Sequence, residues 1–198
     1  KVLHAGHLYT SIVGDAISHL LANAGAEVHR VNFGGDVGLH VAKCMWAILK
    51  EFEGENPDKL ANIAEAERSD WLSAKYVEGH AAYDDESLKP AIVEINKRIY
   101  QLHSDNDHDS AFAQIYWTAR DWSYKYFHEF YGRVGISFEK YYPESETAPI
   151  GLATVREQLQ KGVFKESDGA IVFEGEPHDL HTRVFINSEG LPTYEAKD

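Results

Sequence analysis

His4-Ala5-Gly6-His7 lies near the start of the chain, between a short apolar segment, Val2-Leu3, and a longer run from Leu8 to Ala24. We expect a strand stub, a turn through the two histidines and then a helix. The N-terminus of a helix carries free N–H groups and a partial positive charge, so it attracts anions. Because Gly6 has no side chain, a nucleotide can approach the backbone closely at that point.

The run from Leu8 to Ala24 has apolar side chains three and four residues apart, which predicts a helix with one apolar stripe. Thr10 and Ser11 are the expected caps at its start, and Gly25 is the expected stop at its end. Glu27 to Phe33 has an alternating character that indicates a strand.

A strand, a helix and a second strand of these lengths predict a crossover unit in a parallel sheet. Ligands of such sheets bind beyond the carboxyl ends of the strands. We therefore expect His4–His7 and the glycine-rich block Asn32–Gly38 to meet at one crevice. The fold class predicted is α/β, a Rossmann-like parallel-sheet nucleotide-binding fold.

The middle of the chain is helical and acidic. Glu53-Gly-Glu-Asn-Pro57 breaks the pattern after a second helix, Val37–Phe52, with Asn56 as the expected N-cap. Further helices are predicted at Asp58–Ala82, Ser87–His103 and Asp109–Tyr131. We interpret 1–52 as the first half of the Rossmann-like domain, 53–131 as an α-helical insertion and 132–198 as a β-rich continuation of that domain. The aromatic residues of the last helix fit packing better than base stacking, because few Lys and Arg residues accompany them.

The remainder of the chain alternates strand and helix signals. A strand is predicted at Ile136–Tyr141 and a helix at Ser145–Gln160. Ser167-Asp-Gly169 and Ser188-Glu-Gly190 lie between apolar segments and predict two hairpins.

Composition limits the possible functions. The net charge of −13 argues against this chain alone binding a nucleic acid backbone, and 43% hydrophobic residues suffice for a core. An apolar run of about 18 residues, as a membrane span requires, is missing, and so is a signal peptide. The single cysteine, Cys44, fits a reducing compartment and a buried role. We expect a cytoplasmic protein that does not contact membranes.

Three blocks carry a resemblance to a known family. They are His4-Ala-Gly-His-Leu-Tyr-Thr-Ser-Ile-Val-Gly-Asp-Ala-Ile, Val31-Asn-Phe-Gly-Gly-Asp-Val-Gly38 and Gly190-Leu-Pro-Thr-Tyr-Glu-Ala-Lys-Asp198. In this order they resemble the catalytic domain of arginyl-tRNA synthetases, which are class I aminoacyl-tRNA synthetases. The first block matches the His-x-Gly-His signature of that class. Because the chain starts just before this signature and stops inside the third block, we expect it to be a piece of a longer protein, inactive in isolation.

The resemblance implies a function and a set of site residues. Arginine would be activated by ATP with Mg²⁺ and transferred to tRNA(Arg), by a monomeric enzyme without a tightly bound, protein-ligated metal. In the family, the two histidines contact the ATP phosphates, and the aspartate of the glycine-rich block and the Tyr-x-x-x-Asp pair bind arginine. The corresponding residues are His4, Gly6 and His7 for ATP, of which His4 and His7 are catalytic, and Asp36, Tyr194 and Asp198 for arginine.

Two alternatives remain open at this point. Other nucleotidyltransferases share His-x-Gly-His and join a nucleotide to a small metabolite. A synthetase-like chain can also act as a binding module without catalysis. The pair Tyr194 and Asp198 would separate the first alternative from an arginine enzyme, because a phenol and a carboxylate suit a planar guanidinium. ATP binding at His4 and His7 would argue against the second.

Overall fold

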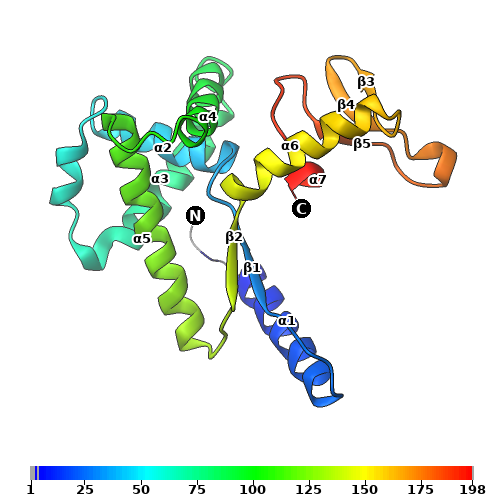
Figure 1. The fold of residues 1–198 in the computed structure, drawn as a ribbon. Helices are drawn as coiled ribbons and strands as arrows, with labels where there is room; N and C mark the ends of the chain where they lie inside the picture. Colours follow the sequence, from blue (N-terminus) through cyan, green and yellow to red (C-terminus); the bar gives the residue numbers. More distant parts are fainter. Residues whose placement is uncertain (1–2, 4, 198) are drawn as a thin grey trace. The chain divides into compact units, whose positions relative to one another are not determined.

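The computed structural model describes residue 3 and residues 5–197. Their Cα positions form two compact units. The first comprises the described residues up to 32 together with 36–141, and the second comprises 33–35 and the described residues from 142 onward. The chain thus passes between the units within the glycine-rich block (Figure 1).

The first helix, α1, runs from Ala5 to Asn23, so it starts before the predicted Leu8 and includes Gly6 and His7, which were expected in a turn. Its end is a Schellman turn: Ala26 N–H donates to the Leu21 carbonyl, and Gly25, with φ 94°, donates to the Ala22 carbonyl. The glycine stop is therefore confirmed. The apolar stripe, in contrast, is not packed, since no described residue of α1 is buried.

The expected caps of α1 are wrong. The helix begins at Ala5, before both residues, so Thr10 and Ser11 lie inside it. Their hydroxyls donate back to the carbonyl of His7, at 3.1 Å from Thr10 Oγ1 and 2.8 Å from Ser11 Oγ. Hydroxyl side chains one turn inside a helix commonly bond this way.

The strand predicted after α1 is shorter than expected: β1 is Val31–Gly34. It pairs with β2, Lys140–Pro143, in a two-stranded parallel sheet (Figure 1). The predicted strand stub is not its partner in the described chain, because Leu3 lies in no strand and Val2 is outside the described residues. Strand pairing depends on distant segments, here more than a hundred residues apart, which local patterning does not show.

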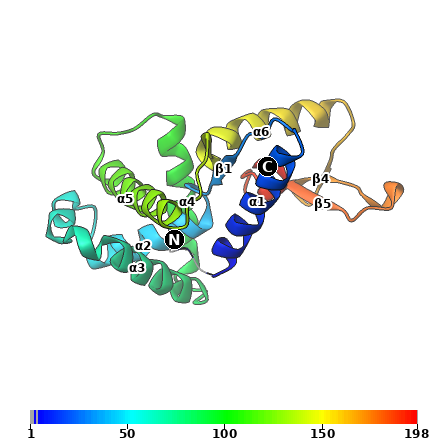
Figure 2. The same ribbon diagram turned by 90° about the horizontal axis from the view of Figure 1, so that it is seen from below.

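Helices α2, α3, α4 and α5 build the main hydrophobic core. Both views show α2 beside α3 (Figures 1 and 2). Their bounds are Leu39–Glu51, Arg68–Tyr83, Lys89–Ser104 and Ala111–Arg133. The largest fully buried side chains belong to this core: Met45, Ile48, Ile92, Ile99, Ile115 and Tyr116. The predicted aromatic helix is thus packed on its neighbours.

One predicted helix of the insertion is wrong in its first half. Instead of a helix from Asp58, the chain forms short 3₁₀ turns at Pro57–Asn62 and Glu65–Glu67, separated by extended backbone at Ile63. Leu60 is 6% exposed and packs in the core formed with α5. Burial of this side chain outweighs the helix propensity of the segment, since propensity is readily overridden by tertiary contacts.

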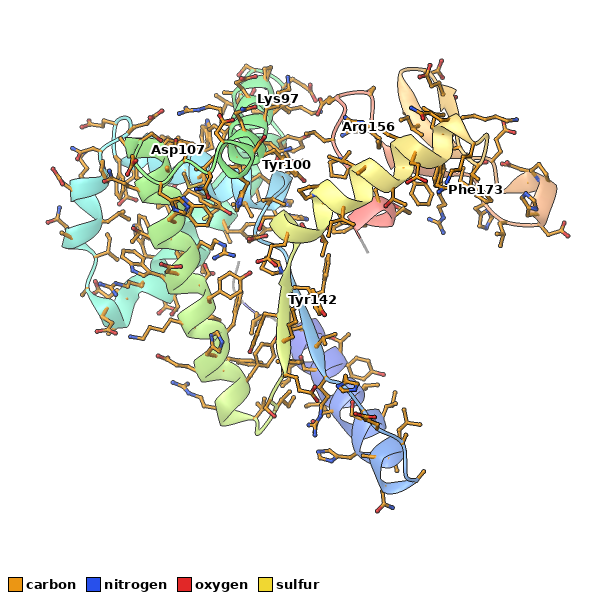
Figure 3. The ribbon with its side chains drawn as sticks, in the orientation of Figure 1. Lys97, Tyr100, Asp107, Tyr142, Arg156 and Phe173 are labelled. Atoms are coloured by element: carbon orange, nitrogen blue, oxygen red, sulfur yellow. The ribbon has the colours of Figure 1, made fainter. Side chains whose placement is uncertain are left out.

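The second unit contains α6, a three-stranded antiparallel sheet and α7. The first predicted hairpin is confirmed, with Ser167 paired to Ala170 and positive φ at Asp168 and Gly169. The helices and strands of the second unit are α6 at Glu144–Gln160, β3 at Lys165–Ser167, β4 at Ala170–Phe173, β5 at Arg183–Ile186 and α7 at Tyr194–Lys197. Phe173, at the end of β4, is labelled in Figure 3.

The second predicted hairpin is confirmed as a reversal of the chain with short antiparallel pairing: Asn187 N–H donates to the Leu191 carbonyl, and Thr193 N–H donates to the Phe185 carbonyl. After β5 the chain makes one isolated bridge, Ile186 to Pro192, and then enters α7. Asn187 holds the turn, because its Oδ1 accepts the N–H groups of Glu189 and Leu191. Pro192 has no N–H to donate, and the last backbone bond of this pairing comes from Thr193, directly before α7.

Cys44 is expected to resist alkylation. Burial raises the pKa of its thiol to about 11, and its Sγ lies 3.7 Å from the Leu72 carbonyl oxygen. Because the thiolate is the reactive form, only about 0.1% of the thiol is available at pH 8. In the folded chain, iodoacetamide should modify Cys44 about 100-fold more slowly than in urea. Equal rates in the two states, followed by mass spectrometry, would contradict this burial.

Candidate functional site

The histidine signature falls at the start of α1. Gly6 and His7 lie in its first turn, and His7 is partly exposed. The carbonyls of Gly6 and His7 accept the Thr10 hydroxyl, which ties this turn to the next. His4, the other histidine of the signature, lies outside the described residues. The N-terminus of a 19-residue helix carries a partial positive charge, which favours an anion there.

Asp36 lies between β1 and α2 and is almost completely buried. Its side chain is 2% exposed, and its Oδ2 accepts Arg120 Nε of α5 at 2.9 Å. Its backbone carbonyl accepts the Tyr116 hydroxyl, also of α5, at 2.8 Å. The predicted meeting of this block with the histidine signature stays a prediction. The contacts of Asp36 described here come from α5, a helix of the predicted insertion.

A second buried carboxylate, Glu144, was missed by the sequence analysis. It is the first residue of α6, directly after β2, and is 4% exposed. The ideal Cβ position of Gly35 is 3.7 Å from its carboxyl carbon, so a glycine of the predicted block faces it. In the sequence, a glutamate after proline resembles an ordinary acidic residue in the first turn of a helix. Its position directly after a strand of the parallel sheet was the available signal.

Glu144 is joined to the residues of the third block. Lys197 Nζ lies 3.2 Å from Glu144 Oε2, and both side chains are nearly buried, at 7% and 6%. The same ammonium lies 4.6 Å from the centroid of the Tyr194 ring. The structure thus places a cation between a carboxylate and an aromatic face, a chemistry that also suits guanidinium.

Tyr194 and Asp198 were predicted to share one face if the segment had begun a helix. The helix α7 does begin at Tyr194, which is 55% exposed. Asp198 lies outside the described residues, so its position relative to Tyr194 stays a prediction. Of the predicted arginine residues, the described chain places Tyr194 beside the buried Glu144–Lys197 pair and Asp36 beside Arg120.

His178 and His181 lie in the segment between β4 and β5. The ring of His178 stacks on that of Phe173, with centroids 5.7 Å apart.

No helix among the described residues is long and apolar enough to cross a bilayer.

Comparison with known proteins places the chain in a family. Residues 1–198 match the family "tRNA synthetases class I (R), catalytic domain". The arginine–tRNA ligases of Bdellovibrio bacteriovorus and Treponema denticola are 29% and 33% identical over 100% of this chain, which covers 33% and 32% of those proteins. The chain therefore spans about a third of the length of these curated relatives.

A solved structure shows the same fold. The arginyl-tRNA synthetase of Plasmodium falciparum superposes with a TM-score of 0.67 at 24% identity, over 100% of this chain and 31% of that one. The match to the family covers every block that the sequence analysis singled out. The chain belongs to the catalytic-domain family of the class I arginyl-tRNA synthetases.

Proposed function

We propose that the complete protein is an arginine–tRNA ligase and that this chain is part of its catalytic domain. The carboxylate of arginine attacks the α-phosphate of ATP, which forms arginyl-adenylate and releases pyrophosphate. The arginyl group then passes to the terminal ribose of tRNA(Arg), and the adenylate leaves as AMP. The observation that carries the proposal is the family match over 1–198, which includes the histidine signature and the third block.

We propose that ATP binds at the start of α1 in a Rossmann-like nucleotide-binding fold. His4 and His7 donate to the phosphates and stabilise the charge that develops on the α-phosphate, while Gly6 leaves room for the nucleotide. The partial positive charge at the start of the helix acts in the same direction. Mg²⁺ enters with ATP as part of the substrate.

We propose that the guanidinium of arginine is recognised by Tyr194 and Asp198, beside the buried Glu144–Lys197 pair. The buried position of Glu144 beside Lys197 and Tyr194 supports this assignment. Asp36, which follows Gly35 directly in the chain, contributes to arginine binding from the loop before α2. A buried carboxylate left without a cation is costly, so substrates that lack the cation are rejected.

We also propose that 53–131 is an insertion between the halves of the nucleotide-binding fold. It supplies most of the core residues of the first unit. Because the chain carries a net charge of −13, contact with the tRNA backbone is expected to rely on other parts of the protein.

Aminoacylation of total tRNA by the complete protein, with each of the twenty amino acids, tests the function. Charging with arginine alone supports the proposal. Charging with another amino acid would keep the class and overturn the assignment of the pocket. A folded protein that binds ATP and charges nothing would refute the ligase function.

The assignment of Asp198 predicts a selective kinetic effect. Removing one partner of a buried carboxylate–guanidinium pair costs about 2–5 kcal/mol. In the complete protein we expect Asp198→Ala to raise the KM for arginine by about thirtyfold or more, with the KM for ATP almost unchanged. Glu189→Ala, at an exposed residue of the preceding turn, is the control. Equal rises in both KM values would exclude a role specific to arginine.

A further inference from the structure

We infer that Arg120 is a positioning residue: its guanidinium holds Asp36, and with it the loop between β1 and α2, in the form that binds arginine. This inference rests on the proposed function and deepens it. It assigns Asp36 to an internal pair with Arg120 rather than to direct contact with the guanidinium of the substrate.

The ion pair itself is the first observation. Arg120 Nε lies 2.9 Å from Asp36 Oδ2, and the two side chains are 21% and 2% exposed. The guanidinium also lies 4.6 Å from the Tyr124 ring centroid and 5.3 Å from that of Trp117. A second guanidinium at the same carboxylate would have to approach a like charge in a poorly hydrated place. The geometry therefore favours an internal partner for Asp36.

A second tether comes from the same face of α5. Tyr116 precedes Arg120 by four residues, which places both on one side of the helix. While Arg120 binds the side chain of Asp36, the Tyr116 hydroxyl donates to its backbone carbonyl at 2.8 Å. One helix thus binds both the main chain and the side chain of Asp36, and two such contacts fix the position of the loop.

The tether extends to α4 through a histidine. His103 Nε2 lies 2.7 Å from the Tyr116 oxygen, and because the single hydroxyl proton goes to Asp36, His103 must be the donor in this bond. Burial raises the pKa of Tyr116, with the Asp36 charge acting in the same direction, so the hydroxyl keeps its proton. Burial also lowers the pKa of His103, which favours the neutral ring.

The position of the loop explains why this matters for arginine. Gly35 faces the carboxyl group of Glu144, and the next residue along the chain is the one that Arg120 holds. A loop released at Asp36 can shift Gly35 away from that carboxylate. Since displacements of about 1 Å at positioning elements change rates strongly, loss of the tether should weaken arginine binding.

A double-mutant cycle in the complete protein tests the inference. Arg120→Ala, Asp36→Asn and the double variant are compared by ATP–pyrophosphate exchange, with tRNA present. We expect each single change to raise the KM for arginine about tenfold, with kcat and the KM for ATP within about twofold of the parent. The double variant should show the same tenfold rise, because each residue acts only through the other.

Two results would overturn the inference. If Asp36 were the direct ligand of the substrate, Arg120→Ala would leave the arginine KM unchanged or lower it, while Asp36→Asn would raise it. If the residues acted independently, their effects would multiply to about a hundredfold. A parent protein that does not activate arginine at all would instead refute the proposed function.

A matched control separates this effect from general loss of an ion pair. Arg98 of α4 pairs with Glu55 at 2.8 Å and lies 4.0 Å from the Phe112 ring centroid, but both charged side chains are about 40% exposed, at 42% and 38%. Arg98→Ala should leave the arginine KM unchanged. If Arg120→Ala does not fold, Arg120→Gln with Asp36→Asn completes the same cycle, and thermal unfolding of each variant verifies the fold.

Discussion

Gly151→Ala is expected to destabilise the second unit and to weaken arginine binding together. A Cβ at this position would lie 1.7 Å from the backbone oxygen of Ala196 in α7. Because the obstacle is backbone rather than a flexible side chain, α6 and α7 must separate. Ala196 is buried with Val155 and Ile186 in a small core, so separation also disturbs that packing.

The expected loss of stability in Gly151→Ala follows from the cost of overpacking. Inserting a methyl group into a packed contact costs about 1–3 kcal/mol, and more where backbone must move. Since α7 begins with Tyr194, we expect the KM for arginine to rise about tenfold in whatever fraction remains folded. Thermal unfolding of the chain and arginine kinetics of the complete protein measure the two effects.

Gly14→Ala is the matched control for this prediction. Gly14 is also inside a helix, but nothing lies within 4 Å of its ideal Cβ position. Alanine is favoured over glycine in helices by about 0.8–1 kcal/mol, so this variant should unfold at the same or a higher temperature than the parent. If Gly151→Ala unfolded as late as Gly14→Ala, the close contact of α6 with α7 would be refuted.

Local signals account for what the sequence predicted correctly. The apolar spacing and Gly25 define α1, and the turn at Asp168 and Gly169 defines the β3–β4 hairpin. Asp107, labelled in Figure 3, shows how local the start of α5 is: its carboxylate accepts the N–H groups of Asp109 and Ser110. Such contacts involve neighbours within a few residues, so the printed sequence already contains them.

Contacts between distant residues account for what the sequence could not show. Glu144 meets Lys197 across 53 positions and Asp36 meets Arg120 across 84. In a helical pattern, a lone lysine or arginine is typical of a solvated face, and burial becomes visible only when the partner is known. The sequence therefore identified Asp36 and Tyr194 as candidate site residues. The roles of Glu144 and Arg120 became visible only once the fold was known.

His7→Ala is expected to abolish most adenylate formation in the complete protein. A donor placed where charge develops in the transition state contributes about 10²–10³ in rate, so ATP–pyrophosphate exchange should fall by about this factor. Because His7 lies in the first turn of α1 and is partly exposed, the fold should remain. The KM for arginine should change little, since the histidine is assigned to the phosphates.

His19→Ala on the same helix is the control that makes this result specific. Its Nε2 lies 3.4 Å from Asp15, and its side chain is 65% exposed. This variant removes a more exposed imidazole more than two helical turns from His7, so exchange should stay within about twofold of the parent. A fall no larger for His7→Ala than for His19→Ala would show that the histidine does not act on the phosphates. His7→Asn, which keeps a side-chain N–H donor, should recover part of the lost rate if donation to the phosphate is what the ring supplies.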